Sequence, residues 1–374
     1  MDSAHTARAP GDKRRWPRPA LVVAILLSVY TTVVLFQHGL NPLALAQIGD
    51  GFANGQPVSS LTGYDGQFSY WLALDPGPAA AGTHFDTPAY RYQRILYPLL
   101  ARWLAFGRTG LVPWMLILVN LAAQVGGVLA VEAWLKAHGV SPWYALTYGL
   151  WVGLVAAVRL DLTEPLSYAL VAAAFVAHYR GRLWLAAFCL ALATFAKETA
   201  LVFWAAQFVW AVLARQRRAW VVFSVAELPF VIWQFVLWRW FGAIGLTSGG
   251  WMATSFEWLP YMGLWRVALV SVPAFALLAT ISLPTVVGPS IWGLVAAARC
   301  LWRRDYSLAV LALGANAALI AVLPFSTFRE PLAVVRLASG LVLSTILFAA
   351  QVGSRRVLNY SLFWMVGLFL LVRA

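Results

Sequence analysis

The segment Gly63–Tyr70 places one carboxylate, Asp65, between two glycines and several aromatic residues. Glycine permits tight backbone turns, and the rings of Tyr64 and Tyr70 are suited to stacking on a sugar or lying at a membrane interface. A carboxylate in a partly dry pocket can accept a proton from a hydroxyl group, which is the role of a general base. The same spacing fits a turn aspartate that caps a helix beginning near Gln67, and the sequence leaves both interpretations open.

Two arginines, Arg91 and Arg94, lie further along the same polar segment. A guanidinium group pairs with phosphate oxygens through a fork of N–H donors, so both residues are candidates for holding a phosphate. The alternative is contact with lipid headgroups, which interfacial arginines commonly make.

Charged residues also interrupt two pairs of short apolar stretches. Lys197 and Glu198 form one apex, where the lysine could neutralise a phosphate and the glutamate could orient it; the alternative is a buried ion pair between two half-spans. Asp161 and Glu164 form the other apex and are candidates for binding acceptor hydroxyls or for a second carboxylate. Glu164 precedes Pro165, so it is equally suited to stabilising the first turn of a helix.

Three charged residues near the C-terminal part complete the candidates. Arg329 and Glu330 lie in a turn and have the same two interpretations as the apex residues. Arg336, which follows within two helical turns, is a further candidate for a phosphate site.

The elements that position these residues are set by composition. The chain has 374 residues, of which 61% are hydrophobic and 11% charged, and its mean hydropathy is +0.74. Apolar runs long enough to cross about 30 Å of hydrocarbon recur almost to the C-terminus, which predicts an all-α polytopic membrane protein. Continuous rather than alternating runs exclude a β-barrel.

The net charge of +13 follows from basic residues in the short loops between apolar runs. That distribution is typical of cytoplasmic loops, so it indicates membrane topology and not a nucleic-acid partner. Most acidic residues fall in the segments on the other side. Cys189 and Cys300 lie in or beside apolar runs and are interpreted as packing residues. The histidines are too scattered to form a metal site, and none is assigned.

Placing the basic loops inside predicts one integral-membrane domain, residues 1–374, with about ten membrane-spanning helices and a range of nine to eleven. Residues 1–19 form a cytoplasmic tail, and the run at 20–37 is predicted to be an uncleaved first span instead of a signal peptide. Residues 38–110 form a long first extracytoplasmic loop, which carries Asp50 and includes interfacial helices, one of them at 95–106. Residues 111–374 form a helical bundle with short loops. Within it, 264–302 is expected to hold one full span plus a partial element.

Several strings resemble a group of bacterial membrane proteins associated with cell-surface glycopolymer formation, which are similar to the GT-C class of integral-membrane glycosyltransferases. The strings are Tyr64-Asp65-Gly66-Gln67-Phe68, Leu72-Ala73-Leu74-Asp75-Pro76, Tyr90-Arg91-Tyr92-Gln93-Arg94-Ile95-Leu96-Tyr97-Pro98, Asp161-Leu162-Thr163-Glu164-Pro165 and Ala196-Lys197-Glu198-Thr199. The resemblance covers roughly the first 215 residues, and the remainder matches only as a run of helices.

The resemblance implies a GT-C-like bundle in the bacterial plasma membrane, with a polyprenyl-phosphate sugar as donor and transfer on the extracytoplasmic face. By motif position, Asp65 is the catalytic acid. Asp50, Tyr64, Gln67 and Tyr70 are assigned to acceptor binding or to support of the site. GT-C enzymes often carry paired acids in this loop, whereas Asp65 has no adjacent acid, so no cofactor is predicted and no metal is indicated.

The predicted function is an inverting glycosyltransferase that moves one sugar from a polyprenyl-phosphate donor to a glycan or glycolipid acceptor. Asp65 would deprotonate the acceptor hydroxyl while Arg94 and Lys197 stabilise the departing lipid phosphate. The alternative from another class is a flippase or transporter of lipid-linked sugars, which would also show broken spans and charges at membrane depth. A non-catalytic assembly subunit is the third hypothesis. Membrane lipids are expected partners in each case.

Overall fold

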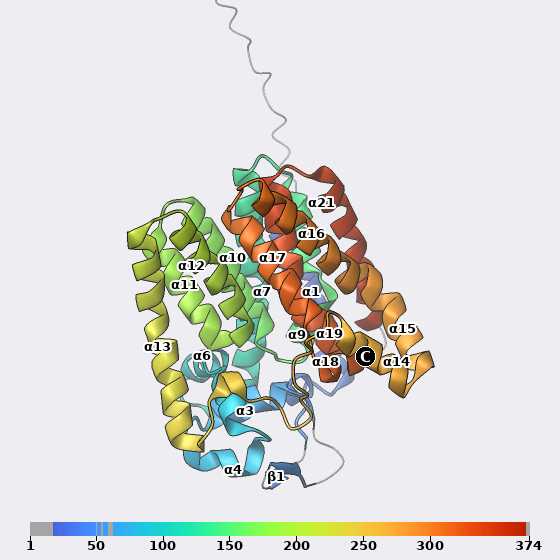
Figure 1. The fold of residues 1–374 in the computed structure, drawn as a ribbon. Helices are drawn as coiled ribbons and strands as arrows, with labels where there is room; N and C mark the ends of the chain where they lie inside the picture. Colours follow the sequence, from blue (N-terminus) through green and yellow to red (C-terminus); the bar gives the residue numbers. More distant parts are fainter. Residues whose placement is uncertain (1–17, 50, 54, 59–62, 372–374) are drawn as a thin grey trace, which may run out of the picture.

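The computed structural model describes residues 18–371 except 50, 54 and 59–62, and over these residues the chain is helical apart from one short hairpin (Figure 1). Five helices are long and apolar enough to cross a membrane, by length and composition. They are α1 (Pro19–Gln37), Thr109–Ala137 with α7 (Val112–Ala137), α13 (Arg217–Phe241), Val272–Trp302, and Pro331–Gln351 with α19 (Pro331–Leu337) and α20 (Ser339–Gln351). The prediction of an all-α membrane protein is therefore confirmed, whereas the predicted count of about ten spans is not.

The segment 264–302 contains one full candidate span and part of one short helix, the arrangement that the sequence favoured. The partial helix is α14 (Met262–Val270). The full span runs without a break through α15 (Val272–Ser282), the π-helical turn Leu283–Val287 and α16 (Gly288–Trp302). Pro284 lies in the π-helical turn. Proline has no backbone N–H to donate, and the turn is a place where the regular hydrogen-bond pattern of the α-helix is already interrupted.

Several apolar helices of the bundle are too short to span the hydrocarbon layer on their own. They are α10 (Glu164–Tyr179), α11 (Leu183–Ala196), α12 (Leu201–Leu213) and α17 (Leu308–Ala321). The 14 residues of α11 rise about 21 Å, compared with about 30 Å of hydrocarbon. Charged residues at the ends of such helices must be paired within the protein or line a cavity.

The remaining elements of the bundle are brief and connect the longer helices. They are η3 (Pro142–Tyr144), α8 (Ala145–Gly149), α9 (Val152–Arg159), η4 (Glu198–Ala200), α18 (Phe325–Arg329), α21 (Arg355–Leu362) and η7 (Phe363–Leu371). A single large core of small and aromatic residues joins α1, α7, α10, α11, α17 and α20.

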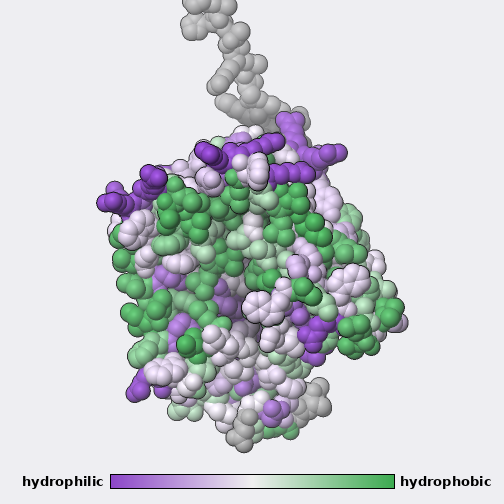
Figure 2. All heavy atoms as spheres, viewed as in Figure 1, coloured by the Kyte–Doolittle hydropathy of each residue, from purple (hydrophilic) through white to green (hydrophobic). Residues whose placement is uncertain are grey.

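The basic residues between helices gather at one end of the bundle, where α1 also begins (Figures 1 and 2). Helices α7, α10 and α12 end there, and α11 and α13 begin there. The opposite end carries the polar segment between α1 and α7. The two ends of the molecule therefore differ in charge.

The polar segment between α1 and α7 folds into short elements. They are α2 (Leu43–Ala46), the hairpin β1 (Phe52–Ala53) and β2 (Gln56–Pro57), α3 (Gly66–Leu74), η1 (Pro78–Ala80), α4 (Ala81–His84), α5 (Pro88–Tyr92), α6 (Leu96–Leu104) and η2 (Thr109–Leu111). Helix α6 occupies most of the stretch 95–106, and Trp103 within it and Phe106 just after it are largely exposed.

Residues 242–261, named the strap below, run from the end of α13 across the bundle to α14 and contain η5 (Gly245–Thr247). Hydrogen bonds tie the strap to neighbouring elements at several places, including the following three. The Leu246 backbone N–H donates to Gln234 at 3.1 Å, that of Trp251 donates to Asp86 at 3.1 Å, and Thr254 exchanges hydrogen bonds with Ser326. The strap is thereby fixed to the polar end of the molecule.

Two glycines allow the turn that carries Asp65 to approach the bundle. Gly63 has a φ of +67°, a conformation that residues with a side chain rarely adopt. A Cβ on Gly66 would lie 2.1 Å from the backbone oxygen of Leu160, in the turn before α10. Backbone packs directly on backbone here, so the start of α3 is held against the start of α10.

Gly66→Ala is predicted to destabilise the protein by about 1–3 kcal/mol, because the backbone of Leu160 has to move. Gly126→Ala is the matched control, since Gly126 lies within α7 with open space around its Cβ position. Thermal unfolding in detergent checks the difference. Equal midpoints for the two variants would mean that the contact does not constrain the turn.

Candidate functional site

A cavity of about 1030 Å³ lies at the polar end of the bundle and is lined by four distant parts of the chain. These are the segment 63–94, the apex 197–199, the strap at 246–256 and the segment 319–337. Figure 2 shows a hollow containing hydrophilic residues on the face seen there, with hydrophobic surface on both sides. Five basic and four acidic side chains line the cavity, so it is strongly charged but close to neutral overall.

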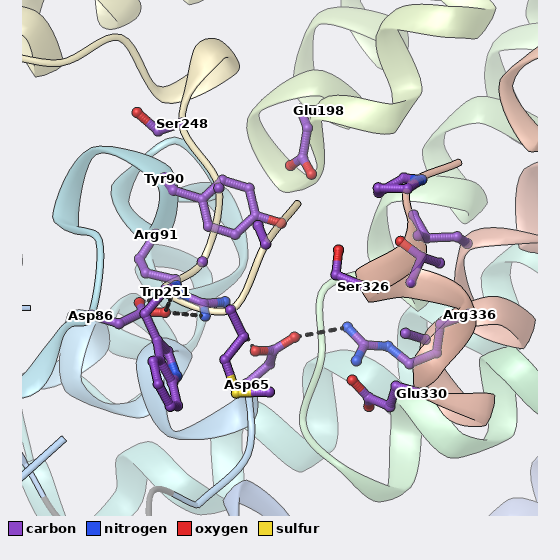
Figure 3. A pocket seen from close by; sticks show the side chains of 18 of the residues that line it. Asp65, Asp86, Tyr90, Arg91, Glu198, Ser248, Trp251, Ser326, Glu330 and Arg336 are labelled. Carbon is purple, nitrogen blue, oxygen red and sulfur yellow. Dashed lines mark hydrogen bonds and ion pairs between the residues drawn. The ribbon is translucent and has the colours of Figure 1, made fainter. Parts of the chain in front are cut away.

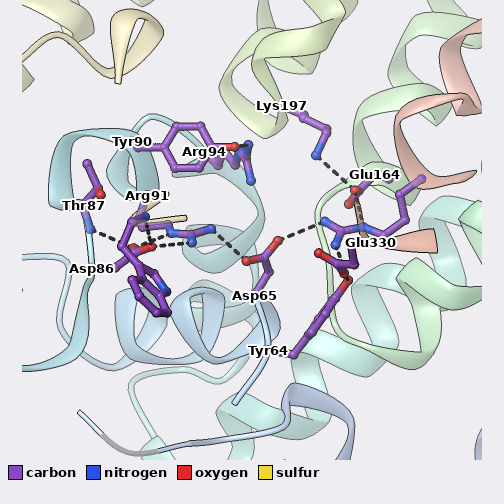
Figure 4. A network of polar contacts seen from close by, with 12 residues as sticks. Tyr64, Asp65, Asp86, Thr87, Tyr90, Arg91, Arg94, Glu164, Lys197 and Glu330 are labelled. Atoms are coloured by element: carbon purple, nitrogen blue, oxygen red, sulfur yellow. Dashed lines mark hydrogen bonds and ion pairs between the residues drawn. The ribbon is translucent and has the colours of Figure 1, made fainter. Parts of the chain in front are cut away.

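Asp65 lies near the middle of the cavity and joins two arginines (Figures 3 and 4). Its Oδ1 accepts a hydrogen bond from Arg91 Nη1 at 3.0 Å, and its Oδ2 accepts one from Arg336 Nη2 at 3.2 Å. It occupies the position before α3 but makes no side-chain hydrogen bond to the helix, so its carboxylate does not act as a cap. The side chain remains 32% exposed, which leaves it open to the cavity.

The arginines also determine the ionisation of Asp65. Burial raises the pKa of its carboxyl, but the charges of Arg91, Arg336, Arg94 and Lys197 outweigh burial and hold the pKa well below the ordinary value. Asp65 is therefore a stable anion at neutral pH, with both oxygens engaged by cations.

The two arginines continue into a longer chain of alternating charges. Arg91 donates two further hydrogen bonds of 2.8 Å to Asp86, which is buried. Arg336 Nε donates to Glu164 at 2.9 Å, and Lys197 Nζ donates to the same oxygen of Glu164 at 3.0 Å. This chain of alternating charges runs in the order Asp86, Arg91, Asp65, Arg336, Glu164, Lys197 (Figure 4).

Glu164 lies behind the cavity and not in its lining. It is the first residue of α10 and fully buried, and it holds two cations that do line the cavity. A carboxylate at a helix N-terminus is also favoured by the helix dipole. The sequence left two interpretations of Glu164, a group that binds acceptor hydroxyls or supplies a second carboxylate, and an acid that stabilises the first turn of a helix. In the structure its carboxylate contacts Lys197 and Arg336 and so supports these two cations.

Arg94 and Glu198 form a separate pair on another wall of the cavity. Arg94 Nε donates to Glu198 at 2.7 Å, and the guanidinium carbon lies 4.4 Å from the centre of the Tyr90 ring. The Tyr90 hydroxyl also accepts a hydrogen bond from Arg94. The ion pair connects the segment after α5 to the start of η4, which fixes the charged apex against the polar segment.

Further sequence candidates join the same cavity. Tyr64 accepts a hydrogen bond from Arg336 Nη1 at 2.8 Å and donates one to Glu330. Gln67 also lines the cavity, and its side-chain oxygen accepts the backbone N–H of Gly49 at 3.2 Å. Arg329 lines the cavity as an exposed side chain at the end of α18.

Other sequence candidates do not lie in the cavity. Tyr70 packs with Trp71, at 5.0 Å between ring centres, and with the apolar cluster under α6. Asp161 is fully buried in a turn with a φ of +50°, and Tyr97 lies 3.5 Å from its carboxylate. Neither residue lines the cavity, so the structure does not support a direct role in acceptor binding for them. Asp50 lies outside the described residues.

Sequence reasoning assigned no role to Asp86, Tyr90, Ser326 or the strap. Asp86 lies five residues before Arg91, and its contact with Arg91 depends on the fold of the segment between them. In the strap, the backbone N–H of Trp251 donates to Asp86, and Trp251 also lines the cavity. The contribution of the strap depends on backbone donors and hydroxyls, which carry no sequence pattern.

No group of three or more His, Cys, Asp or Glu side chains in the described part of the chain is arranged to hold a metal ion. Three of the four acids that line the cavity, Asp65, Asp86 and Glu198, are instead paired with arginine. The chain matches no protein-family model, no curated protein and no solved structure.

Glu164→Ala is predicted to destabilise the protein by about 3–5 kcal/mol, because Lys197 and Arg336 would lose their shared buried partner. The control is Glu257→Ala, which breaks a pair with the half-exposed Arg266 and should cost about 0–1 kcal/mol. Thermal unfolding in detergent compares them. A loss from Glu164→Ala no larger than the control would contradict the importance of the buried chain.

Acid should weaken the fold through Asp86. Burial raises the pKa of its carboxyl, but the hydrogen bonds from Arg91, Trp251 and Thr87 lower the pKa below the ordinary value of 3.8. Since the folded pKa is depressed, the stabilisation is present above pH 3.8 and is lost as the pH falls through the lower folded value. Asp86→Asn should flatten this decline in melting temperature, whereas Asp75→Asn, at an exposed acid, should leave it as in the wild type. Parallel curves of melting temperature against pH for the wild type and both variants would exclude a contribution of Asp86 ionisation to stability.

Proposed function

We propose that the protein is a membrane glycosyltransferase that moves a sugar from a polyprenyl-phosphate donor to a lipid-linked or cell-surface glycan acceptor. The observation that carries the proposal is the convergence of cations from three distant segments on one cavity with a central carboxylate. The first segment contributes Arg91 and Arg94, the second contributes Lys197, and the third contributes Arg336. Guanidinium and ammonium groups are the usual partners of phosphate oxygens.

The location of the cavity supports a reaction on the extracytoplasmic face. Basic loops favour the cytoplasm, and here they gather at the end opposite the cavity (Figure 1). This orientation places the N-terminus in the cytoplasm. With the resemblance of the sequence strings, it leads to the bacterial plasma membrane as the proposed location.

The depth of the cavity supports a lipid-linked substrate. Lys197 follows α11, whose length of about 21 Å is less than the hydrocarbon thickness. A helix that begins at the basic end therefore leaves Lys197 short of the opposite headgroup level, so a lipid phosphate would reach it by entering the cavity below that level. The hydrophobic surface beside the hollow in Figure 2 would accommodate the polyprenyl chain.

The bundle is proposed to be GT-C-like on the basis of the sequence strings alone. About ten crossings would require the short helices to pair with each other or with loops to complete a span, in addition to the five long helices.

In the proposed reaction, the acceptor oxygen attacks the anomeric carbon while the bond from that carbon to the phosphate oxygen breaks. The bonding electrons leave with the phosphate, where Arg94, Lys197 and Arg336 stabilise the added charge. Asp65 is proposed to orient the guanidinium groups of Arg91 and Arg336 toward this phosphate. Asp65 keeps both arginines in place before the donor binds, which reduces the reorganisation needed during the reaction.

One observation favours an enzyme over a flippase of lipid-linked sugars. The residues that line the cavity come from one end of the bundle, and the hollow at the other end is lined by a different set, including Arg18, Glu132 and Lys136. A transporter needs one substrate site that is reached alternately from both faces.

Purified wild-type protein is expected to release free polyprenyl phosphate from a labelled polyprenyl-phosphate sugar when an acceptor glycan is present. Lys197→Met should lower kcat by about 10²-fold or more, because the departing phosphate loses a cation. Lys136→Met is the matched control, at a lysine of the opposite end, and should retain full activity.

The cellular counterpart of this experiment uses Asp65→Asn. The variant should reach normal levels in the membrane and fail to support formation of the surface glycopolymer. Normal glycopolymer in cells that express it would count strongly against the proposal, as would translocation of labelled donor by purified protein without release of polyprenyl phosphate.

A further inference from the structure

The cavity contains one carboxylate that no cation holds. Glu330 lines the cavity and is exposed, and among the described residues no lysine or arginine lies within ion-pairing distance of it. Its side chain accepts a hydrogen bond from the Tyr64 hydroxyl. An ionised carboxylate offers about four acceptor positions, so this bond leaves most of them open to a ligand.

The other acids of the cavity are engaged. Asp65 has one oxygen on Arg91 and the other on Arg336, at 3.0 and 3.2 Å. Asp86 receives two hydrogen bonds from Arg91, and Glu198 is paired with Arg94. Such cations stabilise the charged form of a carboxylate and so make it a weak proton acceptor.

Glu330 is also held beside the phosphate-binding groups. It begins the turn into α19, which carries Arg336, and Tyr64 bridges the two side chains through its hydroxyl. Figures 3 and 4 show the carboxylates of Glu330 and Asp65 close together beside Arg336. Burial raises the pKa of the Tyr64 hydroxyl, and the nearby Glu330 and Asp65 charges add to this although Arg336 opposes it. Tyr64 therefore keeps its proton and fixes the orientation of Glu330 as a donor.

We infer that Glu330, and not Asp65, is the catalytic base that accepts the proton of the acceptor hydroxyl. This inference rests on the proposed glycosyl transfer. The acceptor oxygen forms a bond to the anomeric carbon, the bond from that carbon to the phosphate oxygen breaks, and the hydroxyl proton moves to a Glu330 oxygen. The phosphate leaves with the bonding electrons toward Arg336 and Lys197.

The assignment divides the work between two carboxylates. Asp65 is a positioning residue, because it acts through Arg91 and Arg336. Glu330 is the group that touches the acceptor. Both oxygens of Asp65 are engaged by arginines, whereas Glu330 has acceptor positions open to the cavity, which is the physical reason for the division.

The test compares Glu330→Gln, Asp65→Asn and wild type in purified form with a labelled polyprenyl-phosphate sugar and an acceptor glycan. Glu330→Gln should lower kcat by about 10²–10⁴-fold with little change in the donor KM, and its rate should lose the acid limb of the pH profile. Asp65→Asn should raise the donor KM and keep that limb. Glu257→Gln is the control acid outside the cavity and should behave as wild type.

Chemical rescue gives a readout that a purely structural role would not move. Glu330→Ala should regain activity when formate is added, because a small carboxylate can occupy the vacated space and accept the proton. Melting temperatures of each variant, together with Glu330→Asp, which should keep part of the activity, separate loss of folding from loss of the base.

The outcomes are distinguishable from a failure of the proposed function itself. Wild-type protein that releases no polyprenyl phosphate would overturn glycosyl transfer. Wild-type activity together with a folded Glu330→Gln variant that retains its kcat and acid limb would overturn only the assignment of Glu330. Formate rescue of an Ala variant at Asp65, and not of Glu330→Ala, would return the base role to Asp65.

Discussion

The chain of alternating charges at the polar end of the bundle is the constraint on which the rest of the structure depends. Charges removed from water are costly unless they are paired, and each internal member of this chain is paired on both sides. Glu164 alone connects the apex before η4 to α19, across a separation of 172 residues to Arg336. The helices that end at the cavity are thereby fixed by their charges as well as by apolar packing.

This pairing also determines what the cavity can bind. Arg91, Arg94, Lys197 and Arg336 are ordered before any ligand arrives, but each already has an acid as its partner. An anionic ligand must therefore share or displace a carboxylate, and a phosphate group can do so because it offers several strong acceptor oxygens. Among the described residues, Glu330 is the acid of the cavity that has no cation within ion-pairing distance. Under the proposed reaction, the paired acids would hold the binding groups in place and Glu330 would accept the proton.

The sequence was sufficient to predict the helical membrane class, the polar segment after the first span and all five basic residues that line the cavity. Asp65 and Arg94 were found because charges are rare in so apolar a chain. Tyr70 was assigned to the site from its nearness in sequence, but helix α3 turns it toward the apolar cluster under α6. The role of Glu164 behind the cavity depends on contacts with α19, which no local pattern contains. The sequence did not determine the number of spans, because the short apolar helices that end at charged residues lack the length of a complete crossing.

A structure of the purified protein with bound polyprenyl phosphate tests the central claim most directly, since the claim is that the cavity receives a lipid-linked phosphate. The account predicts the phosphate within hydrogen-bond distance of Arg94, Lys197 or Arg336, with the lipid chain leaving along the apolar surface beside the hollow. A phosphate bound at the basic end of the bundle, or a cavity that stays empty at saturating lipid, would contradict it.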